Sequence, residues 1–96
     1  MVIHVTDHLS GCATNEDGEV LLGLVEDAIR REGSAVVDFH GVLYTTTSFV
    51  NSAFLPLLER MSFDEVKKRL RIVKAYPQIT SMIRDRMSQE SSPAAA

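Results

Sequence analysis

The hydrophobic positions of the first third of the chain follow two different spacings. Residues 2–5 are short and rich in β-branched side chains, which favours a strand. From Glu19 to Gly33 the apolar residues recur every three or four positions, as in an amphipathic helix, and the glycine provides its stop. These apolar positions are Val20, Leu21, Leu24, Val25, Ala28 and Ile29. Residues 6–18 between the two patterns are rich in turn-forming residues, which predicts a loop with room for a short edge strand around Leu9.

A compact apolar run occupies residues 35–39. Its neighbours Val36 and Val37 are both apolar, so the run does not show the alternation of a strand with one solvated face. A central parallel strand that is buried on both faces explains this pattern. We therefore expect helices on both sides of the sheet, and both valine side chains nearly inaccessible.

A glycine and a proline interrupt two of the helical patterns. Gly23 should cost about 1 kcal/mol relative to alanine inside a helix, so it marks either close packing or a tolerated weakness. Pro56 lies within a second helical pattern and lacks a backbone N–H donor, so it should kink that helix or divide it. The apolar positions of this second pattern are Phe49, Ala53, Phe54, Leu57 and Met61.

Capping signals mark the starts of two helices in the second half of the chain. Residues 45–48 all carry hydroxyl groups, and one of them is suited to cap the helix that contains Phe49. Ser62 and Glu65 have the spacing of a capping box, which predicts a short helix through Leu70.

The last part of the chain completes an α/β pattern. Residues 71–76 favour a third strand, Pro77 fits the first turn of a last helix, and residues 89–96 are typical of a frayed tail. The order strand, helix, strand, helix, helix, strand, helix predicts a mostly parallel small sheet with right-handed crossovers and about four covering helices. Because 96 residues suffice for one core only, we expect a single α/β domain over residues 1–88, followed by a flexible tail.

Charge is distributed unevenly along the chain. The net charge is −3, but residues 1–64 hold ten acids against three bases, whereas residues 65–96 hold three acids against seven bases. Such asymmetry indicates either oriented association with a charged partner or a solvated helix face. An acidic chain without interleaved aromatic residues is unsuited to nucleic acid, so we expect no nucleic-acid partner.

Cysteine use and hydropathy indicate the compartment. Cys12 is the single cysteine and cannot form an intramolecular disulfide, which favours a reducing environment. No apolar run approaches the roughly 20 residues that a membrane helix needs, so we expect no membrane association. The sequence therefore predicts a cytoplasmic protein.

Two sets of residues have side chains suited to a metal site or a catalytic triad, but they lack the sequence spacing that such sites usually show. His4 and His8 are four residues apart and would share a face of a continuous strand, yet neither belongs to a metal-binding spacing. Asp38, His40 and Ser48 are the residue types of a nucleophilic triad, but no nucleophile elbow accompanies them. Glycine-rich phosphate-binding motifs are also lacking. We therefore expect no catalytic residues, no metal and no cofactor.

Residues 36–42 (Val-Val-Asp-Phe-His-Gly-Val) and the following residues 45–50 resemble the signature of STAS domains, the fold of bacterial anti-sigma-factor antagonists. They are still more similar to the bacterial STAS-like domains of undefined function. In these families an apolar strand ends in an Asp, an apolar residue, a variable residue, Gly and Val, and a hydroxyl-bearing turn then opens a helix. The resemblance covers most of the chain and implies a STAS-like fold.

The resemblance also implies a regulatory role. The STAS turn usually reads Asp-Ser-Ser-Gly, and its first serine accepts a phosphoryl group from a partner kinase. Aligned through residues 38–42, these four positions fall on Thr46, Thr47, Ser48 and Phe49, so the acid and the glycine are replaced. The candidate phosphoacceptors are therefore Thr47 and Ser48, at a helix start that tolerates negative charge.

The leading hypothesis is a non-enzymatic, STAS-like regulatory domain that binds a protein partner, such as a histidine-kinase-like ATPase or another signalling protein. The expected contact surface is the turn with the outward side of the following helix. Its residues are Thr45, Thr46, Thr47, Ser48, Val50, Asn51 and Leu55. The alternatives are a small-ligand or nucleotide sensor that uses the same turn, and a hydrolase built on His40 and Ser48. A homodimer is compatible with each of these hypotheses.

Overall fold

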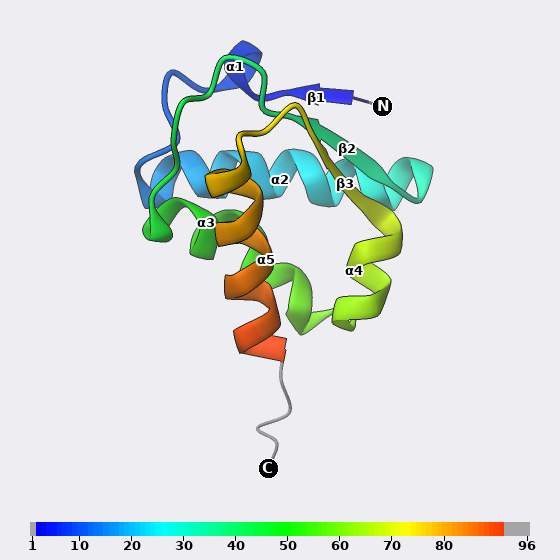
Figure 1. Ribbon diagram of the computed structural model, residues 1–96. Helices are drawn as coiled ribbons and strands as arrows, with labels where there is room; N and C mark the ends of the chain where they lie inside the picture. Colours follow the sequence, from blue (N-terminus) through cyan, green and yellow to red (C-terminus); the bar gives the residue numbers. More distant parts are fainter. Residues whose placement is uncertain (1, 92–96) are drawn as a thin grey trace.

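Three short parallel strands form the sheet, which lies at one end of the molecule (Figure 1). The computed structural model describes residues 2–91. Strands β1 (Val2–His4), β2 (Ala35–Asp38) and β3 (Leu70–Val73) lie in the order β1-β2-β3, and both pairings are parallel. The apolar run of β2 therefore lies in the centre of the sheet, as the sequence predicts.

Five α-helices and one 3₁₀ helix connect and follow the strands within the described part of the chain. They are α1 (Val5–His8), α2 (Asn15–Glu32), α3 (Thr47–Phe54), the 3₁₀ helix η1 (Leu55–Glu59), α4 (Phe63–Arg69) and α5 (Pro77–Ser91). None of those helices combines the length and apolar character that crossing a bilayer requires.

The N-terminal loop is shorter than expected. The edge strand expected around Leu9 is not formed, because residues 5–8 make one turn of helix, and the N–H of Leu9 donates to the carbonyl oxygen of Val5 at 2.9 Å. Helix α2 begins four residues before Glu19, because Thr14 caps it and accepts a hydrogen bond from the N–H of Asp17 at 3.1 Å. The first turn of this helix is mostly polar and shows no hydrophobic periodicity. The hydrophobic pattern alone therefore predicted the start of the helix four residues too late.

The proline and serine signals of the second half are confirmed. Helix α3 ends at Phe54, and Pro56 lies in the separate 3₁₀ helix η1. Ser62 caps α4, since its Oγ accepts a hydrogen bond from the N–H of Glu65 at 3.1 Å. Helix α5 continues through Ser91, so the first three residues assigned to the flexible tail are helical, and residues 92–96 lie outside the described residues.

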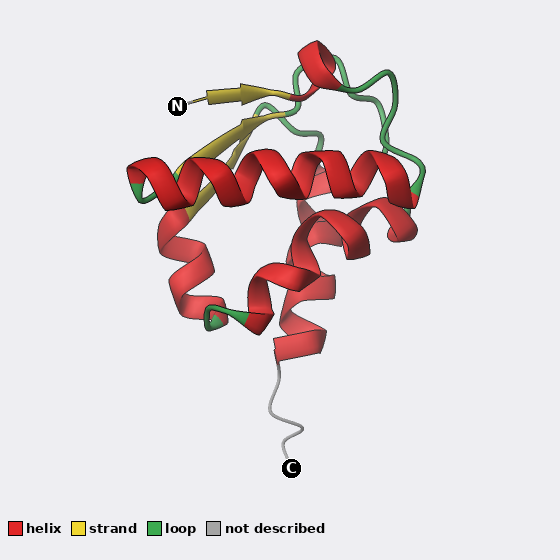
Figure 2. Cartoon of the chain, turned by 180° about the vertical axis from the view of Figure 1, so that it is seen from behind, coloured by secondary structure: helices red, strands yellow, loops and turns green. Residues whose placement is uncertain are grey.

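The sheet is covered by helices on one face, which corrects the expectation of helices on both faces. Side chains of Ile3, Val37 and Ile72 are neighbours on the covered face and belong to or pack against the hydrophobic core. On the other face Val2 is 47% exposed and Val36 is half-buried outside that core. The strand order does not reverse, so two right-handed crossovers place both connections on the same face. Figure 2 views the molecule from the side on which α2 lies in front of the strands.

Candidate interaction site at the carboxyl end of the sheet

The segment between β2 and α3 is held by main-chain and side-chain hydrogen bonds. The N–H of Val42 donates to the carbonyl oxygen of Phe39 at 2.9 Å. The N–H of Thr46 donates to the carbonyl oxygen of Cys12 at 3.2 Å, and its hydroxyl donates to that of Ala13 at 2.8 Å. The same hydroxyl caps α3, because it accepts a hydrogen bond from the N–H of Phe49 at 3.2 Å. Thr46 thus joins this loop to the loop before α2.

Two of the four hydroxyl residues, Thr45 and Thr46, use their hydroxyl groups in hydrogen bonds within the fold. Thr46 makes the cap just described, and it is half-buried. Thr45 is buried, and its hydroxyl donates to Sδ of Met82 on α5 at 3.7 Å. The expected contact role of Thr45 is therefore wrong, because α5 covers this side chain. The hydroxyl of Thr46 is likewise occupied within the fold.

The other two hydroxyl residues, Thr47 and Ser48, are exposed, and so are the two residues just before Thr45. Thr47 and Ser48 occupy the first two positions of α3 and are exposed. Leu43 is 74% exposed and Tyr44 is 65% exposed. The loop is thus anchored at Thr45 and Thr46. Two large exposed side chains precede this anchor in the sequence, and two exposed hydroxyl groups follow it.

Val50 is fully buried, so its assignment to the outward side of the helix is wrong. The sequence pattern allowed for one buried stripe along this helix. In the structure α3 contacts α2 and also α5 and η1, which widens its buried surface. The buried residues of α3 are Phe49, Val50, Ala53 and Phe54. Phe49, Ala53 and Phe54 were expected in the core, and the structure adds Val50 to them.

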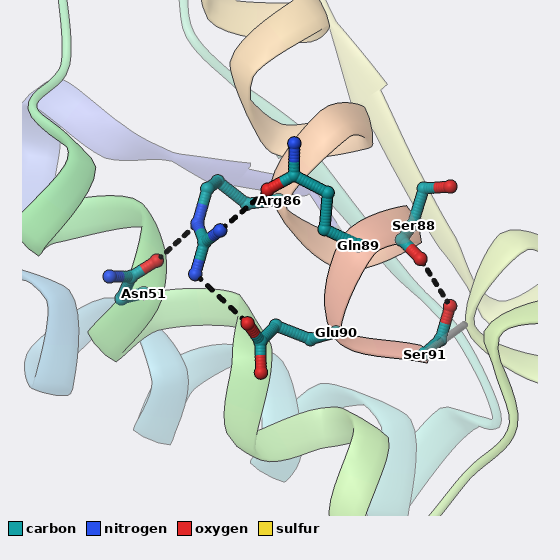
Figure 3. A network of polar contacts seen from close by, with 6 residues as sticks. All are labelled: Asn51, Arg86, Ser88, Gln89, Glu90 and Ser91. Atoms are coloured by element: carbon teal, nitrogen blue, oxygen red, sulfur yellow. Dashed lines mark hydrogen bonds and ion pairs between the residues drawn. The ribbon is translucent and has the colours of Figure 1, made fainter. Parts of the chain in front are cut away.

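Asn51 and Leu55 lie where α3 and η1 meet their neighbours, and neither is freely exposed. Asn51 is half-buried, and its Oδ1 accepts a hydrogen bond from Nε of Arg86 at 2.9 Å. Figure 3 shows that Arg86 also donates to Gln89 at 2.7 Å and to Glu90 at 3.2 Å. Leu55 is half-buried against the hydrophobic core. The structure therefore separates both residues from the exposed part of the turn.

A polar cluster joins the carboxyl ends of the three strands. Asp38 at the end of β2 is buried, and its Oδ1 accepts a hydrogen bond from the N–H of His40 at 2.7 Å. Its Oδ2 lies 3.2 Å from Nδ1 of His4 at the end of β1 and 3.9 Å from Nζ of Lys74 just after β3. Lys74 has a φ of 58°, in the left-handed region. The carboxylate thus holds the two outer strands and this strained lysine together.

The pKa of Asp38 lies below its ordinary value. The hydrogen bond from the N–H of His40 is the main cause, burial acts in the opposite direction, and the charges of Lys74 and His4 lower the pKa further. A depressed carboxyl pKa stabilises the fold above the pKa of the unfolded chain, and this contribution is lost as the pH falls toward the folded-state pKa.

We expect Asp38→Asn to lower the urea midpoint at pH 7 because the charged partner of His4 and Lys74 is lost. The difference from wild type should shrink as the pH falls below about 4, where the wild-type carboxyl takes up its proton. Urea titrations followed by circular dichroism at several pH values measure this. Asp85→Asn removes an exposed carboxylate and is the control. A difference that stays constant down to pH 2 would contradict the linkage.

The two residue sets with site-like chemistry are not assembled. Asp38 bonds the backbone N–H of His40, and no hydrogen bond joins Ser48 to either residue within residues 2–91. His4 pairs with Asp38, whereas His8 ends α1. In the described part of the chain, no group of three or more His, Cys, Asp or Glu side chains is placed to hold a metal ion.

Sequence reasoning missed Leu43, Tyr44 and Lys74. Leu43 and Tyr44 stand between a predicted strand and a predicted helix cap and belong to neither pattern, which is the signal that could have marked them as exposed loop residues. Lys74 was placed inside a longer third strand. Its position at the strand end follows only from the register with Asp38.

Comparison with known proteins identifies one relationship. Residues 17–80 match the family model described as STAS-like domain of unknown function (DUF4325). This range includes the second and third strands and the segment between β2 and α3. No curated protein and no solved structure matches the chain significantly.

Proposed function

This chain belongs to the family of STAS-like domains of unknown function, and from that premise we propose that it is a non-enzymatic regulatory domain that binds another protein. The observation that carries the proposal is the anchored loop with exposed Leu43 and Tyr44. Large apolar side chains in water are unfavourable, and tyrosine is enriched in protein interfaces. A loop that is already fixed by Thr45 and Thr46 loses little conformational entropy on binding.

Control by phosphorylation is the second part of the proposal. Thr47 and Ser48 are the first two residues of α3, where backbone N–H groups lack partners within the helix. The helix dipole favours negative charge at this end, so a phosphoryl group would be tolerated here. On Thr47 it would add about two negative charges three residues after Tyr44 in the sequence. A partner bound to this loop would therefore respond to the modification.

The family resemblance supports a kinase-like partner. In STAS domains, the position that aligns with Thr47 receives a phosphoryl group from a partner kinase, and Ser48 is the next hydroxyl. We therefore propose a histidine-kinase-like ATPase or another signalling protein as the partner. The proposed alternative of a nucleotide sensor at this turn has less support, because the hydroxyls of Thr45 and Thr46 already have partners within the chain.

We propose that the protein acts in the cytoplasm, where the single cysteine Cys12 would stay reduced. Cys12 is buried, and burial together with the nearby charge of Asp17 raises the pKa of its thiol to about 11. The thiol is therefore protonated at neutral pH and is a poor nucleophile. This supports a packing role for Cys12, beside the loop that Thr46 anchors.

The test uses the histidine-kinase-like ATPases of the host that supplies the gene, beginning with any that is encoded next to it. Calorimetry measures binding, and mass spectrometry after incubation with ATP detects modification of Thr47 or Ser48. We expect the double variant Leu43→Ser, Tyr44→Ala to weaken binding at least about tenfold with an unchanged urea midpoint, since interface energy is concentrated in few residues. Thr47→Glu should change the affinity in the same direction as phosphorylation.

The matched control is Val20→Ser, which removes an apolar side chain that is 48% exposed and belongs to α2, not to the loop. It should bind like wild type. If the loop variant binds normally while Val20→Ser binds weakly, the partner contacts α2, and the assignment of the loop is wrong. Absence of phosphate on Thr47 and Ser48 in protein isolated from its host, with unchanged binding by Thr47→Glu, would remove the phosphorylation part alone.

A further inference from the structure

A groove of about 460 Å³ lies between α4, β3 and α5, on the covered face of the sheet and away from the Leu43–Tyr44 loop. Figure 1 shows the arrangement of its walls, with α4 leading into β3 and α5 following it. The groove is lined by Phe63, Val66, Lys67, Leu70, Ile72, Thr80, Ile83, Arg84, Met87 and Ser88. Six of these ten side chains are wholly apolar. The groove therefore offers an apolar floor that no other part of the described chain fills.

The charged residues of the groove are all cationic. Lys67 on α4 and Arg84 on α5 are both exposed and stand on opposite walls, and no carboxylate is among the lining residues. Nζ of Lys67 lies 4.9 Å from the centre of the Phe63 ring and 3.5 Å from Oδ1 of Asp64, an exposed neighbour on the same helix. Arg84 forms no ion pair among residues 2–91. An anion at the mouth of the groove would therefore meet the charge of Arg84, which has no ion-pair partner there, and that of Lys67, which it would share with Asp64.

We propose that this groove binds a small amphipathic molecule with an apolar chain and an anionic head, such as a medium-chain fatty acid. The volume is within the range of small-molecule sites, which are mostly apolar with a few polar groups that fix orientation. The chain lies against Leu70, Ile72 and Ile83, and the head interacts with Lys67 and Arg84. The proposed regulatory domain would then bind a small molecule at a surface different from the loop proposed to bind its protein partner.

Charge also argues against a second copy of this protein as the occupant. A symmetric contact through this groove would bring Lys67 and Arg84 of one protomer toward the same residues of the other. Like charges that face each other across an interface are unfavourable. An acyl chain with a carboxylate head satisfies the apolar floor and the cationic rim together.

The probes are decanoate and decyltrimethylammonium, which have apolar chains of similar length and opposite head charges, both used below their micelle concentrations. Calorimetry is expected to show decanoate binding at least about tenfold tighter than the cationic probe, with one site per chain. In ¹³C methyl spectra the resonances of Ile72 and Ile83 should shift on addition of decanoate. Equal affinity for the two probes, or shifts confined to other methyl groups, would overturn the proposal.

Three variants locate the site. The double variant Lys67→Gln, Arg84→Gln should lose the preference for decanoate over decyltrimethylammonium. Ser88→Phe places a ring in the groove from an exposed position and should abolish binding of both probes. The control Lys68→Gln removes the neighbouring exposed charge of α4, which does not line the groove, and should bind decanoate like wild type.

Two further outcomes decide between occupants and between proposals. A Ser88→Phe variant that folds and still binds decanoate, or sedimentation showing a dimer that decanoate dissociates, would overturn the proposed ligand site. The loop variant Leu43→Ser, Tyr44→Ala should retain decanoate binding, because those residues lie outside the groove. If that variant binds the protein partner normally while decanoate binds as expected, only the loop proposal fails. If it loses partner binding while decanoate does not bind the wild type, only the groove proposal fails.

Discussion

Replacing Val37 by aspartate is expected to unfold this domain. Val37 is fully buried at the centre of β2, between Ile3 of β1 and Ile72 of β3 on the covered face of the sheet. The substitution loses about 1.5–3 kcal/mol of apolar burial and places a carboxylate among apolar side chains without a partner. A domain of this size has only about 5–15 kcal/mol of stability to lose. Circular dichroism and urea titration should show an unfolded or severely destabilised chain at neutral pH.

Val36→Asp is the matched control for this prediction. Val36 is the preceding residue of the same strand, is half-buried on the uncovered face, and has Val2 and Arg71 as its cross-strand neighbours. An aspartate there remains hydrated and faces the exposed guanidinium group of Arg71, so we expect a loss of about 1 kcal/mol or less. If both variants lost the same stability, the second face of the sheet would be covered after all.

Gly18→Ala is expected to destabilise the domain although alanine favours helix. A Cβ on Gly18 would lie 2.6 Å from the carbonyl oxygen of Phe49 and 2.7 Å from Cβ of Ser52. The first of these is a backbone atom of α3, so the two helices would have to move apart. Overpacking of this kind costs about 1–3 kcal/mol, which exceeds the gain of roughly 1 kcal/mol in helix propensity. Thermal and urea unfolding should show the net loss.

Gly23→Ala on the same helix should have the opposite effect. Gly23 is exposed, and no atom lies within 4 Å of the position its Cβ would take. The variant should therefore gain about 0.5–1 kcal/mol from helix propensity alone. The decisive result is that the change in the free energy of unfolding has opposite signs for Gly18→Ala and Gly23→Ala. A stabilised Gly18→Ala would mean that α2 and α3 are further apart than the structure shows.

Local sequence signals determined the kinds and order of the longer secondary-structure elements, whereas the one-turn helix α1 was not expected. Pro56 divides the helix, Ser62 begins α4, and Pro77 begins α5, because a missing donor or a well-placed acceptor acts within one helical turn. The central position of β2 also followed from its apolar run. The resemblance of residues 36–42 and 45–50 to STAS-like domains identified the family that the comparison confirms.

The exposure of individual side chains was decided only by the tertiary structure. Val50 is buried in α3, a helix that packs on α2 and also on α5, which lies about 30 residues further along the chain. The hydroxyl groups of Thr45 and Thr46 donate hydrogen bonds to Met82 and Ala13, which lie 37 and 33 residues away in the sequence. A hydrophobic pattern indicates which residues of a helix are suited to burial. It does not indicate how many other helices or strands will pack on that helix.

The uncovered face of the sheet was likewise decided by the tertiary structure and not by a local sequence pattern. The adjacent valines of β2 are compatible with burial on two faces, but strand order decides where the crossovers lie, and it is a property of the whole chain. The groove between α4, β3 and α5 likewise exists only once three separate segments meet. The amino-acid sequence by itself therefore determined the longer elements, the proline and serine signals of the second half, and the family. The exposed loop of Leu43 and Tyr44, the one-sided sheet and the cationic groove arise from long-range packing, which brings together residues that share no local pattern.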